Sequence, residues 1–311
     1  MKKLPTILES LHLVSKPILA RAGFSYTQMG RKDYKFGVWT KELKQTGKGS
    51  FVLLPGFGDT PMSWFRFLIF MRKVLNANFS KVVFVDYPGF LGYDRSLPAF
   101  PSMDLLIEEC NWLLEELRPD TLLGHSLGGW LGGWHCVLSE HKPRKVLLAN
   151  PSGVLVGKEK QQVWQKVFQE ARTRGIAAFR KNVFGKEPIW FGAIAREFDS
   201  FLFRNDINQF MDSVREDHLL NDRLRDVGSD VWLLWGEKDS LVPSEWARDW
   251  VAALGKGQIA FVKEVGHSPH VEAPHTFADL VSHIHGSKLD SFESYLLDKN
   301  PLRKKWQILA Q

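Results

Sequence analysis

The sequence of 311 residues predicts an α/β protein with a mostly parallel β-sheet. Several short runs rich in Val, Leu and Phe end at Gly, Pro, Ser or Asp, and their apolar character is continuous rather than alternating. Continuous apolar runs are typical of strands buried on both faces, as in parallel sheets. Helix-like stretches lie between these runs, so strands and helices alternate along the chain, which is the pattern of the α/β class.

The expected elements follow one another with short connections. Strands are expected at residues 51–56, 81–88, 121–126, 145–151, 231–239 and 258–266. Helices are expected at residues 64–76, 103–118, 127–140, 244–254 and 276–284. Ahead of them, residues 24–29 and 33–41 have a period of two, which predicts an antiparallel hairpin at the edge of the sheet.

The alternation stops in residues 154–228, which read as helices without strands, with long helices expected at 161–184 and 207–227. We therefore divide the chain into a main domain (1–153 and 229–286), a helical insertion (154–228) and a C-terminal tail (287–311). The insertion is rich in aromatic residues: Trp164, Phe168, Phe179, Phe184, Trp190, Phe191, Phe198, Phe201, Phe203 and Phe210. We expect most of them to pack the insertion on the main domain and a minority to line a pocket.

Composition and charge exclude several classes of protein. The apolar content of 44% and charged content of 24% are those of an ordinary globular chain. The net charge of +6 is spread along the sequence, with a dense cluster only at residues 303–305, so no nucleic-acid partner is expected. The two cysteines, Cys110 and Cys136, have neither a disulfide framework nor the spacing of metal ligands.

The first 22 residues predict an amphipathic helix that Pro17 would kink. Its apolar face carries Leu4, Ile7, Leu8, Leu11, Val14 and Ile18. Polar and charged residues interrupt the apolar stretch that a secretory signal needs, and no run is long enough to span a membrane, so a cytoplasmic location is expected. We expect the helix to pack on its own domain. Contact with a membrane surface, supported by Lys2, Lys3, Lys16 and Arg21, is the alternative.

The central motif is the pentapeptide G-x-S-x-G at residues 124–128, placed between an expected strand and an expected helix. A sharp strand-to-helix turn would hold Ser126 in strained dihedrals, and bulky side chains at positions 124 and 128 would collide there, so glycine is required at both. The turn also places the serine oxygen at a helix N-terminus, where developing negative charge is favoured.

A serine hydroxyl needs a neighbouring base, itself oriented by a third group, to act as a nucleophile. Asp239 follows one later strand and His267 follows the next, which gives the chain order serine, acid, histidine. Glu237 is an alternative carboxylate and His270 an alternative histidine. Their positions fit the pattern less well.

Together these motifs resemble the α/β-hydrolase family, specifically its capped serine hydrolases of the esterase and monoacylglycerol-lipase type. The resemblance covers about residues 30–286. It rests on Leu54-Pro55-Gly56-Phe57-Gly58, Gly124-His125-Ser126-Leu127-Gly128-Gly129, Gly236-Glu237-Lys238-Asp239 with Val242-Pro243, and residues 266–274 with the sequence GHSPHVEAP. It implies an α/β-hydrolase fold with an eight-stranded, mostly parallel sheet flanked by helices, and a helical cap at residues 154–228.

The resemblance also implies roles for individual residues. Ser126 would be the nucleophile, His267 the general base and acid, and Asp239 the group that fixes the imidazole tautomer. The backbone N–H groups of Phe57 and Leu127 would form the oxyanion hole. Pro55 stands where many relatives have histidine, so the side-chain network that braces this loop must differ.

We expect no cofactor and no metal, because the histidine spacings form no recognisable zinc signature and no glycine-rich nucleotide loop is present. The expected function is hydrolysis of carboxylic esters with an apolar acyl group, and the expected partner is therefore a small apolar ester. Hydrolysis of carbon–carbon bonds, aminopeptidase activity and a non-hydrolytic binding role are the alternatives. A homodimer also stays open, because the tail with Trp306, Ile308 and Leu309 would dock either on the core or on a second subunit.

Overall fold

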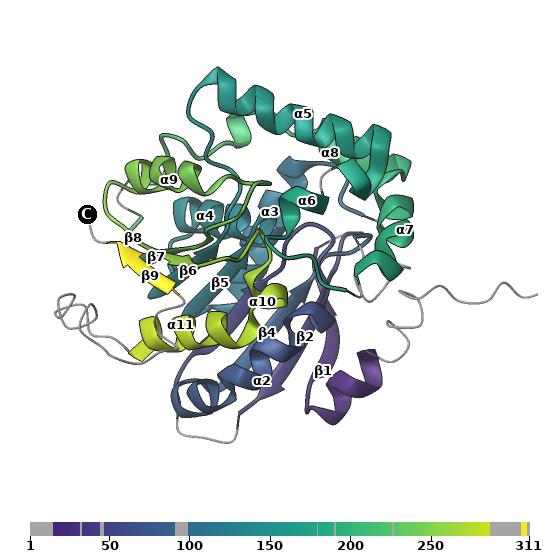
Figure 1. The fold of residues 1–311 in the computed structure, drawn as a ribbon. Coiled ribbons are helices and arrows are strands. Elements are labelled where there is room, and N and C mark those ends of the chain that lie inside the picture. Colours follow the sequence, from purple (N-terminus) through teal and green to yellow (C-terminus); the bar gives the residue numbers. More distant parts are fainter. Residues whose placement is uncertain are drawn as a thin grey trace, which may run out of the picture.

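A single twisted sheet forms the centre of the molecule in the computed structural model, which describes residues 15–31, 33–43, 47–90, 99–178, 180–189, 191–225, 227–286 and 306–309 (Figure 1). Its strands lie in the order β1-β2-β4-β3-β5-β6-β7-β8-β9. They are β1 (Ser25–Met29), β2 (Phe36–Glu42), β3 (Ser50–Leu54), β4 (Lys81–Asp86), β5 (Thr121–His125), β6 (Lys145–Ala149), β7 (Asp230–Gly236), β8 (Gln258–Val262) and β9 (Trp306–Leu309).

The central strands β4, β3, β5, β6, β7 and β8 are parallel, whereas β1, β2 and β9 are antiparallel to their neighbours. The fold class and the edge hairpin predicted from the sequence are confirmed. The ninth strand was not predicted. It comes from the C-terminal tail and pairs with β8 of the same chain, with Ile308 opposite Ala260.

Helices cover both faces of the sheet. They are α2 (Pro61–Asn78), α3 (Met103–Leu117), α4 (Leu127–Leu138), η3 (Ser244–Trp246), α9 (Ala247–Leu254), α10 (Pro269–Glu272) and α11 (Pro274–Gly286). One buried core unites α3, α4 and α9 with one face of the sheet, and a second core unites α2 and α11 with the other. Strand side chains alternate between the two cores: Val52 and Leu54 enter the first, whereas Phe51 and Leu53 enter the second.

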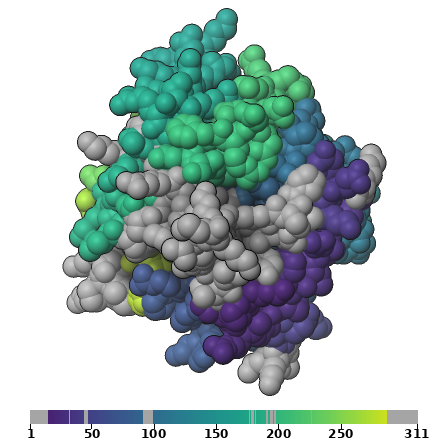
Figure 2. All heavy atoms as spheres, turned by 90° about the vertical axis from the view of Figure 1, so that its right-hand side faces the viewer, coloured from purple at the N-terminus to yellow at the C-terminus, as the bar shows by residue number. Residues whose placement is uncertain are grey.

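The insertion between β6 and β7 is helical and lies above the carboxyl ends of the strands (Figure 1). It contains α5 (Lys158–Arg174), η1 (Gly175–Ala178), α6 (Arg180–Val183), α7 (Phe191–Leu202), α8 (Asn205–Asp212) and η2 (Glu216–His218). In Figure 2 the insertion, coloured teal and green, forms the upper part of the visible surface, and the earlier residues in purple and blue lie below it and to its right.

Two helices predicted for the insertion are wrong in length. The predicted helix 161–184 breaks at Gly175, whose φ of +66° is favourable only for glycine and where a Cβ would lie 2.2 Å from Asp199 Oδ1. The predicted helix 207–227 ends at Asp212. There the Ser213 hydroxyl donates to the Phe210 carbonyl oxygen and accepts from the backbone N–H of Met103, so a contact with the main domain replaces the next helical turn.

The N-terminal segment is helical over residues 15–21, and its Leu19 is buried in the main-domain core beside α2. Most of the predicted apolar face, from Leu4 to Val14, lies outside the described residues. Over the described part of the chain, none of the helices combines the length and the apolar character that crossing a bilayer requires.

A buried histidine between α4 and α3 predicts how the free energy of unfolding depends on pH. His135 on α4 is wholly buried, with its Nδ1 2.8 Å from Asn111 Oδ1, and burial lowers its pKa to about 4 from 6.5. Between these values the unfolded chain binds a proton that the folded protein does not, so the free energy of unfolding falls as the pH is lowered. The loss from this residue is at most about 3 kcal/mol.

Urea unfolding at a series of pH values checks this prediction. His135→Gln keeps a donor for Asn111 but does not titrate, so it should lose less stability than the wild type between neutral pH and pH 4. His285, whose pKa burial also lowers to about 4, titrates in both proteins and cancels in the comparison. Equal losses in the two proteins would show that His135 does not contribute.

Candidate active site

Ser126 lies at the turn between β5 and α4 in a conformation that non-glycine residues rarely adopt, with φ 51° and ψ −113°. The turn is tight because backbone lies against both flanking glycines. A Cβ on Gly124 would lie 2.3 Å from the Gly128 carbonyl oxygen, and a Cβ on Gly128 would lie 2.3 Å from the carbonyl oxygen of Leu54. These contacts are the physical reason for the glycines at positions 124 and 128.

The structure brings Ser126, His267 and Asp239 together, although they lie far apart in the sequence. His267 Nε2 is 2.9 Å from Ser126 Oγ, and His267 Nδ1 is 2.8 Å from Asp239 Oδ2. The side chain of Asp239 is fully buried and that of His267 is 5% exposed. Because a buried carboxylate beside Nδ1 favours the tautomer with its proton there, Nε2 can accept the proton of the serine hydroxyl.

Asp239 is held in place by donors other than His267. The backbone N–H groups of Leu241 and Val242 donate to its Oδ1 over 2.9 and 3.0 Å, and the Asn150 amide donates to its Oδ2 over 2.7 Å. Four donors therefore surround this one buried carboxylate and fix its position beside His267. The alternative carboxylate, Glu237, instead accepts from the backbone N–H of Glu264 at an exposed position.

The loop that carries His267 is fixed by Glu272. Its carboxylate accepts from the backbone N–H groups of Gly266 and Ser268 in the loop, and from those of Gly185 and Lys186 in the insertion. Burial raises the pKa of Glu272 although these hydrogen bonds oppose the rise. One side chain thus ties the histidine loop to the insertion.

His270 does not contact Ser126. It is buried and stacks on Trp64, with ring centroids 3.9 Å apart and an angle of 5° between the rings. It also lies against Asp59, from the loop after β3, and against His125, which directly precedes the serine. His270 therefore belongs to a second polar group behind the serine and His267.

The residues predicted to supply oxyanion donors also meet at the serine. Leu127 is the first residue of α4, so its N–H has no acceptor within the helix. Phe57 follows Gly56, where a Cβ would lie 3.3 Å from Ser126 Cβ. In place of a histidine at position 55, the loop is braced by Asp59, whose carboxylate accepts from Trp64 Nε1 over 2.8 Å and from the N–H of Thr60 over 3.0 Å.

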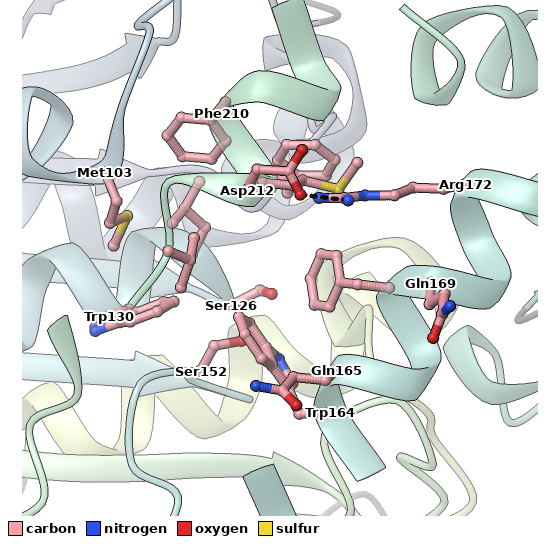
Figure 3. Close-up of a pocket in the computed structure, with 15 residues that line it drawn as sticks. Met103, Ser126, Trp130, Ser152, Trp164, Gln165, Gln169, Arg172, Phe210 and Asp212 are labelled. Atoms are coloured by element: carbon pink, nitrogen blue, oxygen red, sulfur yellow. Dashed lines mark hydrogen bonds and ion pairs between the residues drawn. The ribbon is translucent and has the colours of Figure 1, made fainter. Parts of the chain in front are cut away.

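Two cavities meet at Ser126, and Phe57, Ser152, Trp164 and Phe168 line both. The larger, of about 450 Å³, is walled mainly by apolar side chains, including Ala171, Phe184, Phe191, Phe198, Leu202 and Val242. The smaller, of about 390 Å³, also contains Gln165, Gln169 and Arg172 (Figure 3). In Figure 3 these polar residues project from α5 on the side of the cavity opposite Met103 and Trp130, and Arg172 pairs with Asp212.

The sequence predicted that only a minority of the insertion's aromatic residues would line a pocket, and this is wrong: among the described residues, Trp164, Phe168, Phe184, Phe191, Phe198 and Phe210 all line a cavity beside Ser126. Phe201 packs on Phe57 and Phe90 of the main domain, whereas Trp164 and Phe168 line both cavities. Phe203 is 48% exposed and does neither. Phe179 and Trp190 lie outside the described residues.

Sequence reasoning missed Asp59, Asn150 and Glu272. Asn150 has φ 46°, and it directly follows β6 at the same edge of the sheet as Asp239 and His267. That position was the available signal, since polar residues that end neighbouring parallel strands meet at one edge. Glu272 lies within the motif that carries His267, but its hydrogen bonds to the insertion depend on the tertiary fold.

Comparison with known proteins agrees with this architecture. The family model described as "Alpha/beta hydrolase family" matches residues 51–280. Monoacylglycerol lipase abhd6-B of Xenopus laevis is 21% identical over 271 residues, covering 80% of this chain and 79% of the relative. A 2-hydroxy-6-oxononadienedioate/2-hydroxy-6-oxononatrienedioate hydrolase of Klebsiella pneumoniae is 22% identical over 265 residues, covering 76% and 86%.

Solved structures show the same fold. A membrane phospholipase A described as a bacterial virulence factor has a TM-score of 0.69 at 18% identity, over 90% of this chain and 93% of its own. A lipase-like protein of Acinetobacter baumannii has a TM-score of 0.65 at 17% identity, over 91% and 97%. The fold, the order of the motifs and the extent of the family match lead to one conclusion: this chain belongs to the α/β hydrolase family.

Proposed function

We propose that the protein is a serine hydrolase that cleaves carboxylic esters with an apolar acyl group through an acyl-enzyme. The observation that carries the proposal is the continuous contact from Ser126 Oγ through the His267 ring to the buried Asp239, at the point where two cavities meet. The similarity to monoacylglycerol lipases supports the same reaction class.

In the proposed mechanism, Ser126 Oγ attacks the ester carbonyl carbon while His267 Nε2 takes the hydroxyl proton. Asp239 stabilises the imidazolium, and the N–H groups of Phe57 and Leu127 stabilise the oxyanion. When the tetrahedral intermediate collapses, the bond from the carbonyl carbon to the alcohol oxygen breaks and the alcohol leaves with the proton from His267. Water then adds to the acyl carbon while His267 takes its proton, and the second tetrahedral intermediate collapses by breaking the bond from that carbon to Ser126 Oγ, which receives the proton from His267 as the acid leaves.

We assign the two cavities to the two halves of the substrate. The larger, apolar cavity fits an acyl chain, because apolar walls gain free energy when they exclude water. The smaller cavity has Gln165 and Gln169 in its wall, which suit an alcohol with further hydroxyl groups. Residues 154–228 would act as the cap over both cavities.

Cleavage of carbon–carbon bonds is the second candidate, since the Klebsiella relative is named for such a dioate substrate. A substrate with carboxylate groups needs cationic partners. Of the cations among the described residues that line the cavities, Arg172 is paired with Asp212 and Arg66 is exposed. This arrangement favours a neutral acyl group and therefore the ester.

The proposal is tested by measuring the hydrolysis of p-nitrophenyl esters from acetate to palmitate. In parallel, the cleavage of a dienedioate analogue of a ring-fission product, a substrate for carbon–carbon bond hydrolysis, is measured. We expect ester turnover with an optimum acyl length, and negligible cleavage of the analogue. Cleavage of the analogue without ester turnover would overturn the ester assignment in favour of the second candidate.

The acyl-cavity assignment predicts the effect of filling that cavity. Ala171 on α5 is buried and lines the larger cavity but not the smaller, so Ala171→Leu should shorten the preferred acyl chain. Because each displaced methylene is worth about 1–3 kcal/mol, kcat/KM for long esters should fall about tenfold or more, with acetate esters little affected. The matched control is Val163→Leu on the same helix, at a side chain 46% exposed. An equal loss for acetate and palmitate esters would contradict the assignment.

A further inference from the structure

The second polar group behind Ser126 joins Asp59, His125 and His270, from three separate segments of the main domain. One ligating atom from each lies within 4.8 Å of the others. His270 Nε2 is 3.1 Å and His125 Nδ1 is 3.5 Å from the same oxygen, Asp59 Oδ2. The side chains of His270, His125 and Asp59 are only 1%, 5% and 11% exposed.

The proton on the His125 ring lies on the nitrogen that faces away from Asp59, so two hydrogen-bond acceptors face each other in this group. His125 Nε2 lies 2.8 Å from the His267 carbonyl oxygen, and because that oxygen can only accept, Nε2 must carry the proton. In the neutral ring Nδ1 is then an acceptor, and it faces the carboxylate of Asp59. Two buried acceptors at this distance repel each other unless a proton or a cation lies between them.

His270 adds a second available nitrogen. Within the part of the chain that the structure describes, neither of its ring nitrogens nor Nδ1 of His125 forms an aligned hydrogen bond.

We propose that Asp59, His125 and His270 form a binding site for a divalent transition-metal cation, with Zn²⁺ as the best match. Bonds of about 2.0–2.1 Å at tetrahedral angles place ligand atoms about 3.3–3.4 Å apart. The two separations from Asp59 Oδ2, 3.1 and 3.5 Å, lie on either side of that value, and all three ligating atoms lie within 4.8 Å of one another. Neutral imidazoles and a carboxylate are the donors that Zn²⁺ takes, and three protein ligands leave a fourth position open.

The surroundings are those of a metal site rather than of an ordinary buried ion pair. A histidine ligand commonly donates its other N–H to a backbone carbonyl, as His125 does to His267. The carboxylate is oriented by Trp64 Nε1 and the Thr60 N–H, and the Ser63 hydroxyl also donates to it. All three ligands line the larger cavity, so a cation would have a route of entry and its fourth position would have room for a water molecule.

The site is tested on the full chain after treatment with a chelator. Zn²⁺ is titrated by isothermal calorimetry, and Co²⁺ binding is followed by its visible d–d absorption, which is intense in tetrahedral sites. We expect one ion per chain and no thiolate charge-transfer band, because Cys110 and Cys136 are not in the ligand set. Asp59→Asn and His270→Gln should each weaken binding at least about tenfold to a hundredfold.

Matched variants show whether the cation binds at these three side chains. His275→Gln, at an exposed histidine on the neighbouring α11, should bind Zn²⁺ as the wild type does. Ser126→Ala should also bind it, so the result does not depend on the proposed hydrolysis. Circular dichroism shows whether each variant folds. If Asp59→Asn does not fold, the affinity of His270→Gln for Zn²⁺ tests the site. Two results would overturn the proposal. One is no Zn²⁺ binding by the wild type, which would mean that a proton bridges His125 and Asp59. The other is an unchanged affinity for Zn²⁺ in folded Asp59→Asn and His270→Gln.

Discussion

Ser126→Ala should lower kcat for a p-nitrophenyl ester by at least about 10⁴-fold while KM changes little. The substitution removes the oxygen that would form the acyl-enzyme, but it leaves the cavities and the Phe57 and Leu127 N–H groups in place. Alanine adopts the φ of 51° about as readily as serine, so the elbow should keep its shape. Steady-state kinetics measure the loss, and thermal unfolding followed by circular dichroism verifies the fold.

The control for this variant is Ser80→Ala, whose hydroxyl donates to the Gly49 carbonyl oxygen at an exposed position away from the cavities. It should keep the wild-type kcat. Full activity of Ser126→Ala would contradict the role of Ser126 as the nucleophile. The activity must co-elute with the purified variant, so that a contaminating esterase does not account for it.

Asp239→Asn should lower kcat by about 10⁴-fold, the second largest effect expected. Asparagine has nearly the same shape but presents an N–H₂ group in place of one oxygen, either Oδ2, which now accepts from both His267 and Asn150, or Oδ1, which accepts from two backbone N–H groups. The imidazole then loses the partner that keeps its proton on Nδ1, and the imidazolium formed during the reaction loses a counter-charge. Steady-state kinetics measure kcat, and a histidine Nδ1–H proton resonance should disappear or shift in the variant.

Glu237→Gln is the matched control, because Glu237 is the other carboxylate that follows β7. Its side chain accepts the backbone N–H of Glu264 at an exposed position rather than an N–H of His267, so kcat should be that of the wild type. If Glu237→Gln lost the activity and Asp239→Asn kept it, the acid would have been assigned to the wrong residue.

The sequence predicted the parts of the fold and site that depend on local patterns. Buried parallel strands leave continuous apolar runs, and the elbow requires glycine two residues before and after the serine. Because Ser126 directly follows β5, and Asp239 and His267 lie in the turns after β7 and β8, their chain positions predicted the edge of the sheet at which the three residues meet.

The parts that sequence did not predict depend on contacts between distant segments. At Gly175, where the predicted helix breaks, a Cβ would lie 2.2 Å from Asp199 Oδ1, and just beyond the end of α8 the Ser213 hydroxyl accepts from the backbone N–H of Met103 in the main domain. The pairing of β9 with β8 leaves no periodic signal in four residues. The group of Asp59, His125 and His270 likewise has no spacing that a metal motif would show, which is why no metal was expected from the sequence.

The most direct test of the central claim is the mass of the protein during turnover of a slowly hydrolysed ester. After an acid quench, the wild type should carry one acyl group, located on Ser126 by peptide fragmentation, and a fluorophosphonate should label the same residue. Asp239→Asn should acquire the acyl group far more slowly, and Ser126→Ala should not acquire it. Ester hydrolysis by the wild type with no adduct on Ser126, or neither hydrolysis nor labelling, would contradict the account and favour a non-hydrolytic binding role in the latter case.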